Sequence, residues 1–223
     1  IFTSCYNHGK YLPQAIESVL GQTHEDFEYL LYGDGSTDNT WDIISTYASQ
    51  DSRIKAFRLP KALCLSEVIN KSFREAQGRY WVWLPADDLL EEKQKIATTY
   101  PDDVLYSFGK HIRESGAIKK LYRPPLLDPE EFREAMRDNH FLGMTGIWIP
   151  MSAYKKAGEF PEHLIYSEDF YWVLCACRAG VDFRGIDKYL YRKRLKSGGL
   201  TSKYRREVKR DINKWREETE WKR

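Results

Sequence analysis

The chain has 223 residues, of which 42% are hydrophobic, so it is long enough to bury the core of one α/β domain. Its 35 basic and 33 acidic residues leave a net charge of +2, with no separate basic face, so we expect no nucleic-acid partner. The sequence contains no apolar stretch long enough to span a bilayer, no signal peptide and no cysteines at metal-binding spacing, which favours a cytoplasmic protein with reduced thiols. Residues 1–5 resemble the end of a strand, so we expect that the natural start is missing.

The first half of the chain alternates short apolar runs with amphipathic segments. Apolar runs bounded by Gly or Pro predict buried strands that end at Cys5, cover 27–32 and 53–59, and cover 80–84. Between them the pattern predicts a helix opened by Leu12-Pro13, a helix capped by Ser36 or Thr37, and a helix capped by Ser66 and closed by Gly78. This alternation is typical of a mostly parallel central sheet flanked by helices, as in nucleotide-binding α/β folds.

The second half is less regular. It predicts a strand over 104–108, a turn at 114–116 between two further strands, a helix opened by 128–131, a glycine-opened strand over 143–149, and an apolar helix over 170–179. We find no interdomain linker, and therefore expect one domain over 1–223. Within it we distinguish a first half (1–105), a second half (106–202) and a C-terminal amphipathic helix (203–223).

Carboxylates follow two of the predicted strands. Asp34 follows the second strand, and the adjacent Asp87 and Asp88 follow the fourth. Ligands of open α/β sheets bind at such strand ends, and a divalent cation relieves the repulsion between neighbouring carboxylates. The alternatives are structural: Asp34 also suits a turn, Asp38 suits a first helical turn, and the adjacent pair suits the cap of a helix from Leu89 onward.

Seven motifs together resemble family 2 glycosyltransferases, which are inverting enzymes of the GT-A fold that use nucleotide-sugar donors. The resemblance covers nearly the whole chain and implies a nucleotide-sugar half (1–105) and an acceptor and catalytic half (106–202). The motifs are Cys5-Tyr6-Asn7-His8, the run 11–23, Gly33-Asp34-Gly35-Ser36-Thr37-Asp38-Asn39-Thr40, Gly78-Arg79-Tyr80, Ala86-Asp87-Asp88, Ala157-Gly158-Glu159-Phe160 and Ser167-Glu168-Asp169.

On the donor side, the resemblance implies that Ser4 and Tyr6 contact the nucleotide and that Asp34 holds the edge of the base. It implies that Asp87 meets the ribose and, with Asp88, the complex of a diphosphate with Mn²⁺ or Mg²⁺. These ions often share a diphosphate with one or two protein carboxylates. UDP-sugars are the donors that the resemblance favours.

On the acceptor side, the resemblance implies that Asp169 is the general base and that Glu168 positions it or the acceptor. The same two acids also suit a helix start behind Ser167, which is the structural alternative. A single carboxylate is sufficient for one inversion. We expect a glycan or a lipid-linked acceptor, in a site that Thr145, Trp148, Tyr166 and Trp172 would line.

The sequence departs from the family at three positions. The family usually has an Asp where Gly33 and Pro85 stand here, and often a His where Arg194 stands. Arg192 and Arg194 could still neutralise diphosphate charge, because guanidinium groups suit phosphate oxygens. The glycine-rich stretch 197–201 is either a loop that closes over the donor or a plain linker.

Two alternatives to the glycosyltransferase remain open, together with a membrane contact. The missing acids at Gly33 and Pro85 also suit a degenerate module that binds a nucleotide or glycan without turnover. A sugar nucleotidyltransferase is less favoured, because residues 4–10 are not the glycine-rich, basic loop of those enzymes. The amphipathic segment 203–223 either packs on the domain or makes a peripheral contact with the inner face of the membrane.

Overall fold

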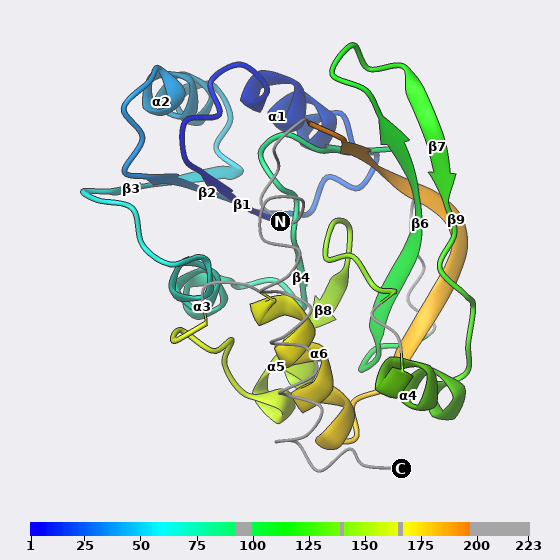
Figure 1. Cartoon of the computed structure of the whole chain (residues 1–223). Helices are drawn as coiled ribbons and strands as arrows, with labels where there is room; N and C mark the ends of the chain where they lie inside the picture. The colour runs from blue at the N-terminus through cyan, green and yellow to red at the C-terminus, as the bar shows by residue number, and fades with distance from the viewer. Residues whose placement is uncertain (92–99, 139–140, 165–166, 197–223) are drawn as a thin grey trace.

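A computed structural model describes residues 1–91, 100–138, 141–164 and 167–196 of the chain (Figure 1). Three parallel strands form the first sheet in the order β1-β2-β3, with bounds β1 (Phe2–Cys5), β2 (Tyr29–Asp34) and β3 (Ile54–Leu59). The connections between these strands are α1 (Leu12–Leu20) and α2 (Thr40–Gln50), and α3 (Leu65–Glu75) follows β3. The parallel, helix-connected sheet predicted for the first half is therefore confirmed.

The second sheet is mixed rather than mostly parallel. Its order is β4-β8-β6-β9-β5, with bounds β4 (Tyr80–Val82), β8 (Trp148–Pro150), β6 (Val104–Ile112), β9 (Phe183–Arg194) and β5 (Leu89–Leu90). Only β6 and β9 pair in parallel; the other pairs are antiparallel, including the hairpin of β6 with β7 (Ile118–Tyr122). The Leu84 N–H donates to Phe2 O at 2.9 Å and so joins the β4 segment to β1.

Three more helices belong to the second half: α4 (Pro129–Asp138), α5 (Met151–Ala157) and α6 (Glu168–Arg178). The predicted cap of α4 is confirmed, because Asp128 Oδ1 accepts the N–H groups of Glu130 and Glu131 at 2.9 Å each. The larger core is built from stacked rings, among them Phe73 on Tyr154 and Phe160 on Trp172.

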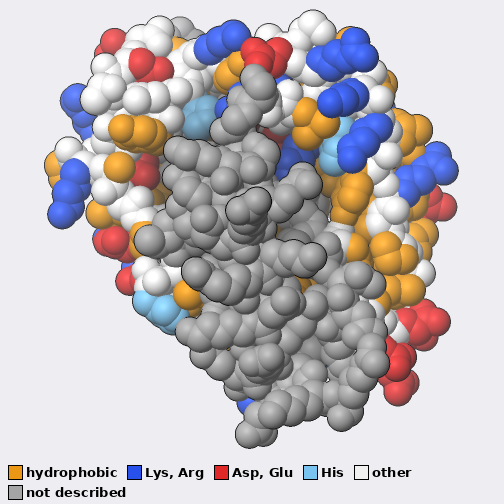
Figure 2. Space-filling view, in the orientation of Figure 1, with side chains coloured by type: hydrophobic (Ala, Val, Ile, Leu, Met, Phe, Trp, Pro, Cys, Tyr) orange, Lys and Arg blue, Asp and Glu red, His pale blue; other side chains and the backbone are white. Residues whose placement is uncertain are grey.

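Strand β7 is an edge of the second sheet and is exposed along most of its length. Its lysines, Lys119 and Lys120, lie between the exposed Ile118 and Leu121. Figure 2 shows Lys and Arg side chains gathered with hydrophobic ones on the β7 side of the molecule. Lysines on an exposed edge strand discourage its pairing with another chain.

Several predicted element boundaries are wrong. Helix α2 begins at Thr40 behind Asn39, because the Ser36 and Thr37 side chains bond the loop after β1 instead; Asp38 therefore precedes the helix. Helix α3 begins at Leu65 behind Cys64, so Ser66 lies inside it, and it ends before Ala76 rather than at Gly78.

Two further corrections concern strands. Of the strand predicted over 143–149, the structure has only β8, which begins at Trp148. Residues Leu89–Leu90 form strand β5, not the start of a helix, so the interpretation of Asp87 and Asp88 as helix caps is wrong. The four cysteines are free, and the described residues include no helix that could cross a membrane.

Candidate active site

Asp34 is the last residue of β2 and lies beside a cavity of ≈ 510 Å³. Its side chain is 7% exposed, and Oδ1 accepts the Leu63 N–H at 2.9 Å. Burial raises the pKa of Asp34 above its ordinary value. The cavity walls come from the end of β2, the loop after it, the start of α2 and the end of β3; they are Gly33, Gly35, Ser36, Thr37, Trp41, Arg58, Leu59 and Pro60. Asp34 thus stands where open α/β sheets bind ligands.

Trp41 explains why a glycine stands at position 33. A Cβ on Gly33 would lie 2.9 Å from Cε3 of the Trp41 ring, which is closer than real contacts allow. The Arg58 guanidinium lies 5.3 Å from the centre of the same ring, on the cavity side. The indole therefore fills the space that a side chain at position 33 would enter.

Hydrogen bonds join the loop after β1 to the loop after β2. Asn7, whose φ of 55° is left-handed, accepts the Thr37 N–H through Oδ1 at 2.8 Å. The Ser36 hydroxyl donates to Cys5 O at 3.0 Å and accepts the Asn7 N–H at 3.1 Å. These bonds fix the backbone around Ser4, which is half-buried in β1, and Tyr6, which is 51% exposed. The structure thus brings the predicted nucleotide contacts Ser4, Tyr6 and Asp34 to adjacent strand ends.

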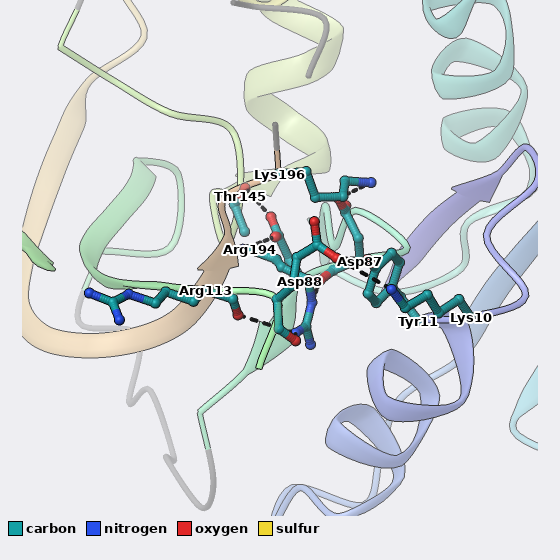
Figure 3. Close-up of polar contacts among 9 residues, drawn as sticks. Lys10, Tyr11, Asp87, Asp88, Arg113, Thr145, Arg194 and Lys196 are labelled. Atoms are coloured by element: carbon teal, nitrogen blue, oxygen red, sulfur yellow. Dashed lines mark hydrogen bonds and ion pairs between the residues drawn. The ribbon is translucent and has the colours of Figure 1, made fainter. Parts of the chain in front are cut away.

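Asp88 is buried in the middle of a polar cluster (Figure 3). Its side chain is 2% exposed, Oδ2 accepts the Thr145 hydroxyl at 2.9 Å, and Oδ1 accepts the Arg194 N–H at 2.7 Å. Burial first, and the neighbouring Asp87 second, raise the pKa of Asp88 to about 7. Asp87 is only partly covered and pairs with the Lys196 ammonium, whose Nζ lies 2.6 Å from Oδ2.

The two predicted arginines have protein partners. Arg194 is 6% exposed, and its guanidinium donates to Asp87 O at 3.0 Å, Glu114 O at 2.9 Å and Gln14 Oε1 at 2.8 Å. It thereby fastens the end of β9 to the loop that carries the acid pair. The Arg192 guanidinium makes a two-pronged contact with Glu91, at 2.9 and 3.0 Å. The structure thus brings Arg194 to Asp87 and Asp88 and turns Arg192 to Glu91.

Glu168 and Asp169 form the first turn of α6. Glu168 is 8% exposed, and burial together with the adjacent Asp169 raises its pKa to about 8. Asp169 is half-buried, and its Oδ1 accepts the Phe170 N–H at 2.7 Å. Ser167, just before the helix, has a left-handed backbone with φ 57°, and its hydroxyl makes no capping bond. A non-glycine residue in this region is strained, and such strain clusters at functional sites.

The predicted acceptor-site residues lie in different places. Thr145 is buried against Asp88, as described above, and Trp172 is fully buried, with Nε1 donating to Gly158 O at 2.9 Å. Trp172 is therefore a packing residue and does not line an acceptor site, which corrects the prediction. Trp148 lies in β8, beside a separate cavity. Tyr166, the stretch 197–201 and the segment 203–223 lie outside the described residues.

Asp87 and Asp88 fit a divalent cation, because the two carboxylates would supply part of its oxygen ligands and a diphosphate would supply the rest. No three His, Cys, Asp or Glu side chains gather into a metal site within the described part of the chain. Mg²⁺ and Mn²⁺ sites of nucleotide enzymes do not need three, because one or two carboxylates share the ion with phosphate oxygens. Burial raises the pKa of Asp88 most and the neighbouring Asp87 raises it further; a cation bound to the pair would favour the ionised carboxylate.

Sequence analysis missed Lys196 and the buried Asn70. Lys196 lies among several basic residues near the end of the described chain, and only the pairing of β9 with β5 and β6 brings it to Asp87. Asn70 lies inside an otherwise amphipathic helix, and its polar side chain at a buried position was the available signal.

Comparisons with known proteins identify the family and the fold of the chain. Residues 1–158 match the model of glycosyl transferase family 2. An uncharacterized glycosyltransferase of Methanocaldococcus jannaschii is 28% identical over 194 residues, which are 83% of this chain and 66% of that protein. The chondroitin synthase of Escherichia coli is 28% identical over 202 residues, which are 87% of this chain and 28% of that protein. The chain thus spans less than two thirds of the length of these relatives.

Two solved structures illustrate the shared fold. Staphylococcus aureus TarS 1–349, in complex with UDP-GlcNAc, superposes with a TM-score of 0.72 and 21% identity, covering 96% of this chain and 65% of that one. The mannosyltransferase PcManGT of Pyrobaculum calidifontis, in complex with GDP-Man and Mn²⁺, gives a TM-score of 0.67 and 14% identity, covering 92% of this chain and 59% of that one. From the family match and the shared architecture, the chain belongs to glycosyl transferase family 2 and has the GT-A fold.

Proposed function

We propose that this domain is an inverting glycosyltransferase that moves a sugar from a nucleotide-diphosphate donor, preferably a UDP-sugar, to a hydroxyl group of a glycan or lipid-linked acceptor. The observation that carries the proposal is the placement of the acids: Asp34 ends β2 between Gly33 and Gly35, which line a cavity, and Asp87 and Asp88 follow β4. Membership of the family and a neighbour of the same fold bound to UDP-GlcNAc support a nucleotide-sugar donor.

The donor would lie along the carboxyl ends of the strands. Asp34 would accept a hydrogen bond from the base, with Ser4 and Tyr6 beside the nucleoside, and Asp87 would meet the ribose. Asp87 and Asp88 would hold Mn²⁺ or Mg²⁺ on the diphosphate; a neighbour of the same fold is described with Mn²⁺. When bound, such an ion neutralises the charge that develops on the departing diphosphate.

Asp169 is the proposed general base. The acceptor oxygen attacks the anomeric carbon from the face opposite the diphosphate, its proton passes to the Asp169 carboxylate, and the bonding pair of the broken C–O bond remains on the diphosphate oxygen. One such displacement inverts the anomeric configuration. Burial, and then the adjacent Asp169, raise the pKa of Glu168, which supports a protonated Glu168 beside the proposed base.

The test is a binding panel followed by a stereochemical readout. UDP, GDP, dTDP and CMP are titrated into the protein by calorimetry with and without Mn²⁺, and UDP is expected to bind best. Transfer or hydrolysis of the matching donor is then followed by NMR, and the first product is expected to have the inverted anomeric configuration. A retained configuration would contradict the proposal.

A module that binds a nucleotide without turnover is the second candidate, favoured by Gly33 and Pro85, where the family usually has acids. It predicts nucleotide binding with no conversion of any donor, and no change in binding when Asp169 is replaced. Release of the sugar by the wild-type protein, lost in Asp169→Asn, would exclude it.

A further inference from the structure

The acid pair already has a cation within the chain, namely the Lys196 ammonium. We propose that Lys196 and a divalent ion compete for Asp87, and that Lys196 acts as the resident cation of the diphosphate site when no divalent ion is bound. This inference rests on the proposed function, because it assigns a charge-neutralising residue to the same donor site.

The contact itself is close and partly shielded from water. Lys196 Nζ lies 2.6 Å from Asp87 Oδ2, and the two side chains are 29% and 15% exposed. The two groups form a close ion pair, and partial burial reduces its screening by salt. A divalent ion that binds Asp87 must therefore displace this ammonium or share the carboxylate with it.

The backbone of β9 holds Lys196 at this position. Two residues earlier, the Arg194 N–H bonds Asp88 Oδ1 at 2.7 Å and the Arg194 Nε bonds Asp87 O at 3.0 Å, so the end of β9 is tied to the acid loop at two points. The Lys196 ammonium also lies 5.2 Å from the centre of the Tyr11 ring, which attracts cations through its face (Figure 3). Lys196 is thus held by a carboxylate, an aromatic face and the strand behind it.

The local charge balance favours an internal cation. Pro85 stands where the family usually has another acid, so two carboxylates remain in this loop. Arg194 adds a positive charge whose partners in the described residues are neutral oxygens of Asp87, Arg113, Glu114 and Gln14. With Pro85 in place of an acid, and with Lys193, Arg194 and Lys196 near the pair, the site attracts a divalent ion less and a diphosphate more than two unpaired carboxylates would.

The experiment measures Mn²⁺ binding directly, with no nucleotide present, from the electron paramagnetic resonance signal of the free ion. Lys196→Met is expected to bind Mn²⁺ at least about fivefold more tightly than the wild type, which corresponds to about 1 kcal/mol. Lys119→Met removes an exposed lysine from β7 and is the matched control, with wild-type affinity expected. Asp87→Asn is expected to lose the site. Equal Mn²⁺ affinity of the wild type and Lys196→Met would overturn the inference.

A second readout is UDP affinity in EDTA, measured by calorimetry. The wild type is expected to bind UDP without metal, Lys196→Met about tenfold more weakly, and Lys196→Arg, which keeps the charge, close to the wild type. Lys196→Met that binds UDP as well as the wild type in EDTA would also overturn the inference. If the wild type binds no nucleotide in either condition, the proposed function fails, whereas the Mn²⁺ comparison still tests the competition for Asp87.

Discussion

Asn70 offers a test of how the two halves of the domain are held together. This α3 residue is fully buried, and its amide makes four hydrogen bonds. Nδ2 donates to Phe160 O at 2.9 Å and to Glu162 Oε1 at 3.0 Å, while Oδ1 accepts the Phe160 N–H at 2.9 Å and the Tyr154 hydroxyl at 3.1 Å. Phe160 in turn stacks on Trp172 of α6, so Asn70 links α3 to the helix whose first turn carries the proposed base.

Asn70→Leu keeps the side-chain size but removes all four bonds. It leaves the Phe160 N–H, the Phe160 carbonyl and the Tyr154 hydroxyl without this partner, and each buried unpaired group costs about 1–3 kcal/mol. Taking the lower value for the three groups gives a loss of about 3 kcal/mol in the free energy of unfolding. For a domain of this size, each kcal/mol lowers Tm by about 2–4 °C, so the expected drop is about 6–12 °C.

The assay is thermal unfolding followed by circular dichroism, with urea unfolding as a check on the free energy. Asn39→Leu is the control, because Asn39 is exposed and its side chain makes no capping bond, so its effect should stay within about 0.5 kcal/mol. A second variant, Asn70→Asp, keeps the Oδ1 acceptor but sets a carboxylate against the Glu162 side chain. Its deficit should therefore shrink at low pH, where the new acid is protonated. An Asn70→Leu protein that melts within about 2 °C of the wild type would refute the reasoning.

Three other predictions concern the site, in addition to the Lys196 experiment. Asp169→Asn is expected to abolish transfer while UDP affinity stays within about twofold, because it removes a proton acceptor and not a donor contact; calorimetry showing equal loss of binding and turnover would exclude the assignment. Glu168 has a folded-state pKa of about 8 against an ordinary value of 4.5, so the folded state holds a proton that the unfolded state has released, and stability from this group falls as pH rises from about 4.5 to 8. Glu168→Gln should therefore flatten the decline of Tm over this range, and an unchanged pH profile would count against the buried, protonated Glu168. Gly33→Asp, which restores the family's usual acid, should destabilise the domain by about 1–3 kcal/mol through its clash with the Trp41 ring; Trp41→Ala should reduce that cost in the double variant, and independent, additive effects in urea unfolding would contradict the explanation.

The sequence was most informative where structure depends on neighbours along the chain. Hydrophobic alternation and turn residues correctly predicted β1 to β4 and the helices between them, and so the strand ends that carry Asp34 and Asp87. The short β5 at Leu89–Leu90 was not predicted, because two leucines after an acid pair suit a helix equally well. Helix α5 was missed too, since its seven residues, Met151–Ala157, include adjacent lysines and show little periodicity.

The rest of the site depends on contacts that no local pattern encodes. Asp88 finds its partners at Thr145 and Arg194, which lie 57 and 106 residues away along the chain. Arg192 and Arg194 were expected to neutralise diphosphate charge; the register of β9 pairs Arg192 with Glu91 and sets Arg194 beside the acid pair, where its guanidinium contacts Asp87 O, Glu114 O and Gln14 Oε1. A sequence pattern identifies a charged residue, but it does not show which oppositely charged or polar group that residue contacts in the folded chain.

The parallel pairing of β6 with β9 also determines when the site can form during synthesis. β6 ends at Ile112 and β9 begins at Phe183, so the pair joins distant parts of the chain, and contacts of this kind form slowly. A nascent chain that has not reached Arg194 has Asp88 without its backbone donor and Asp87 without Lys196, with the β9-facing edge of β6 unpaired. The amino-terminal half can organise first, and the acid pair acquires its cationic surroundings only as the last described strand is added.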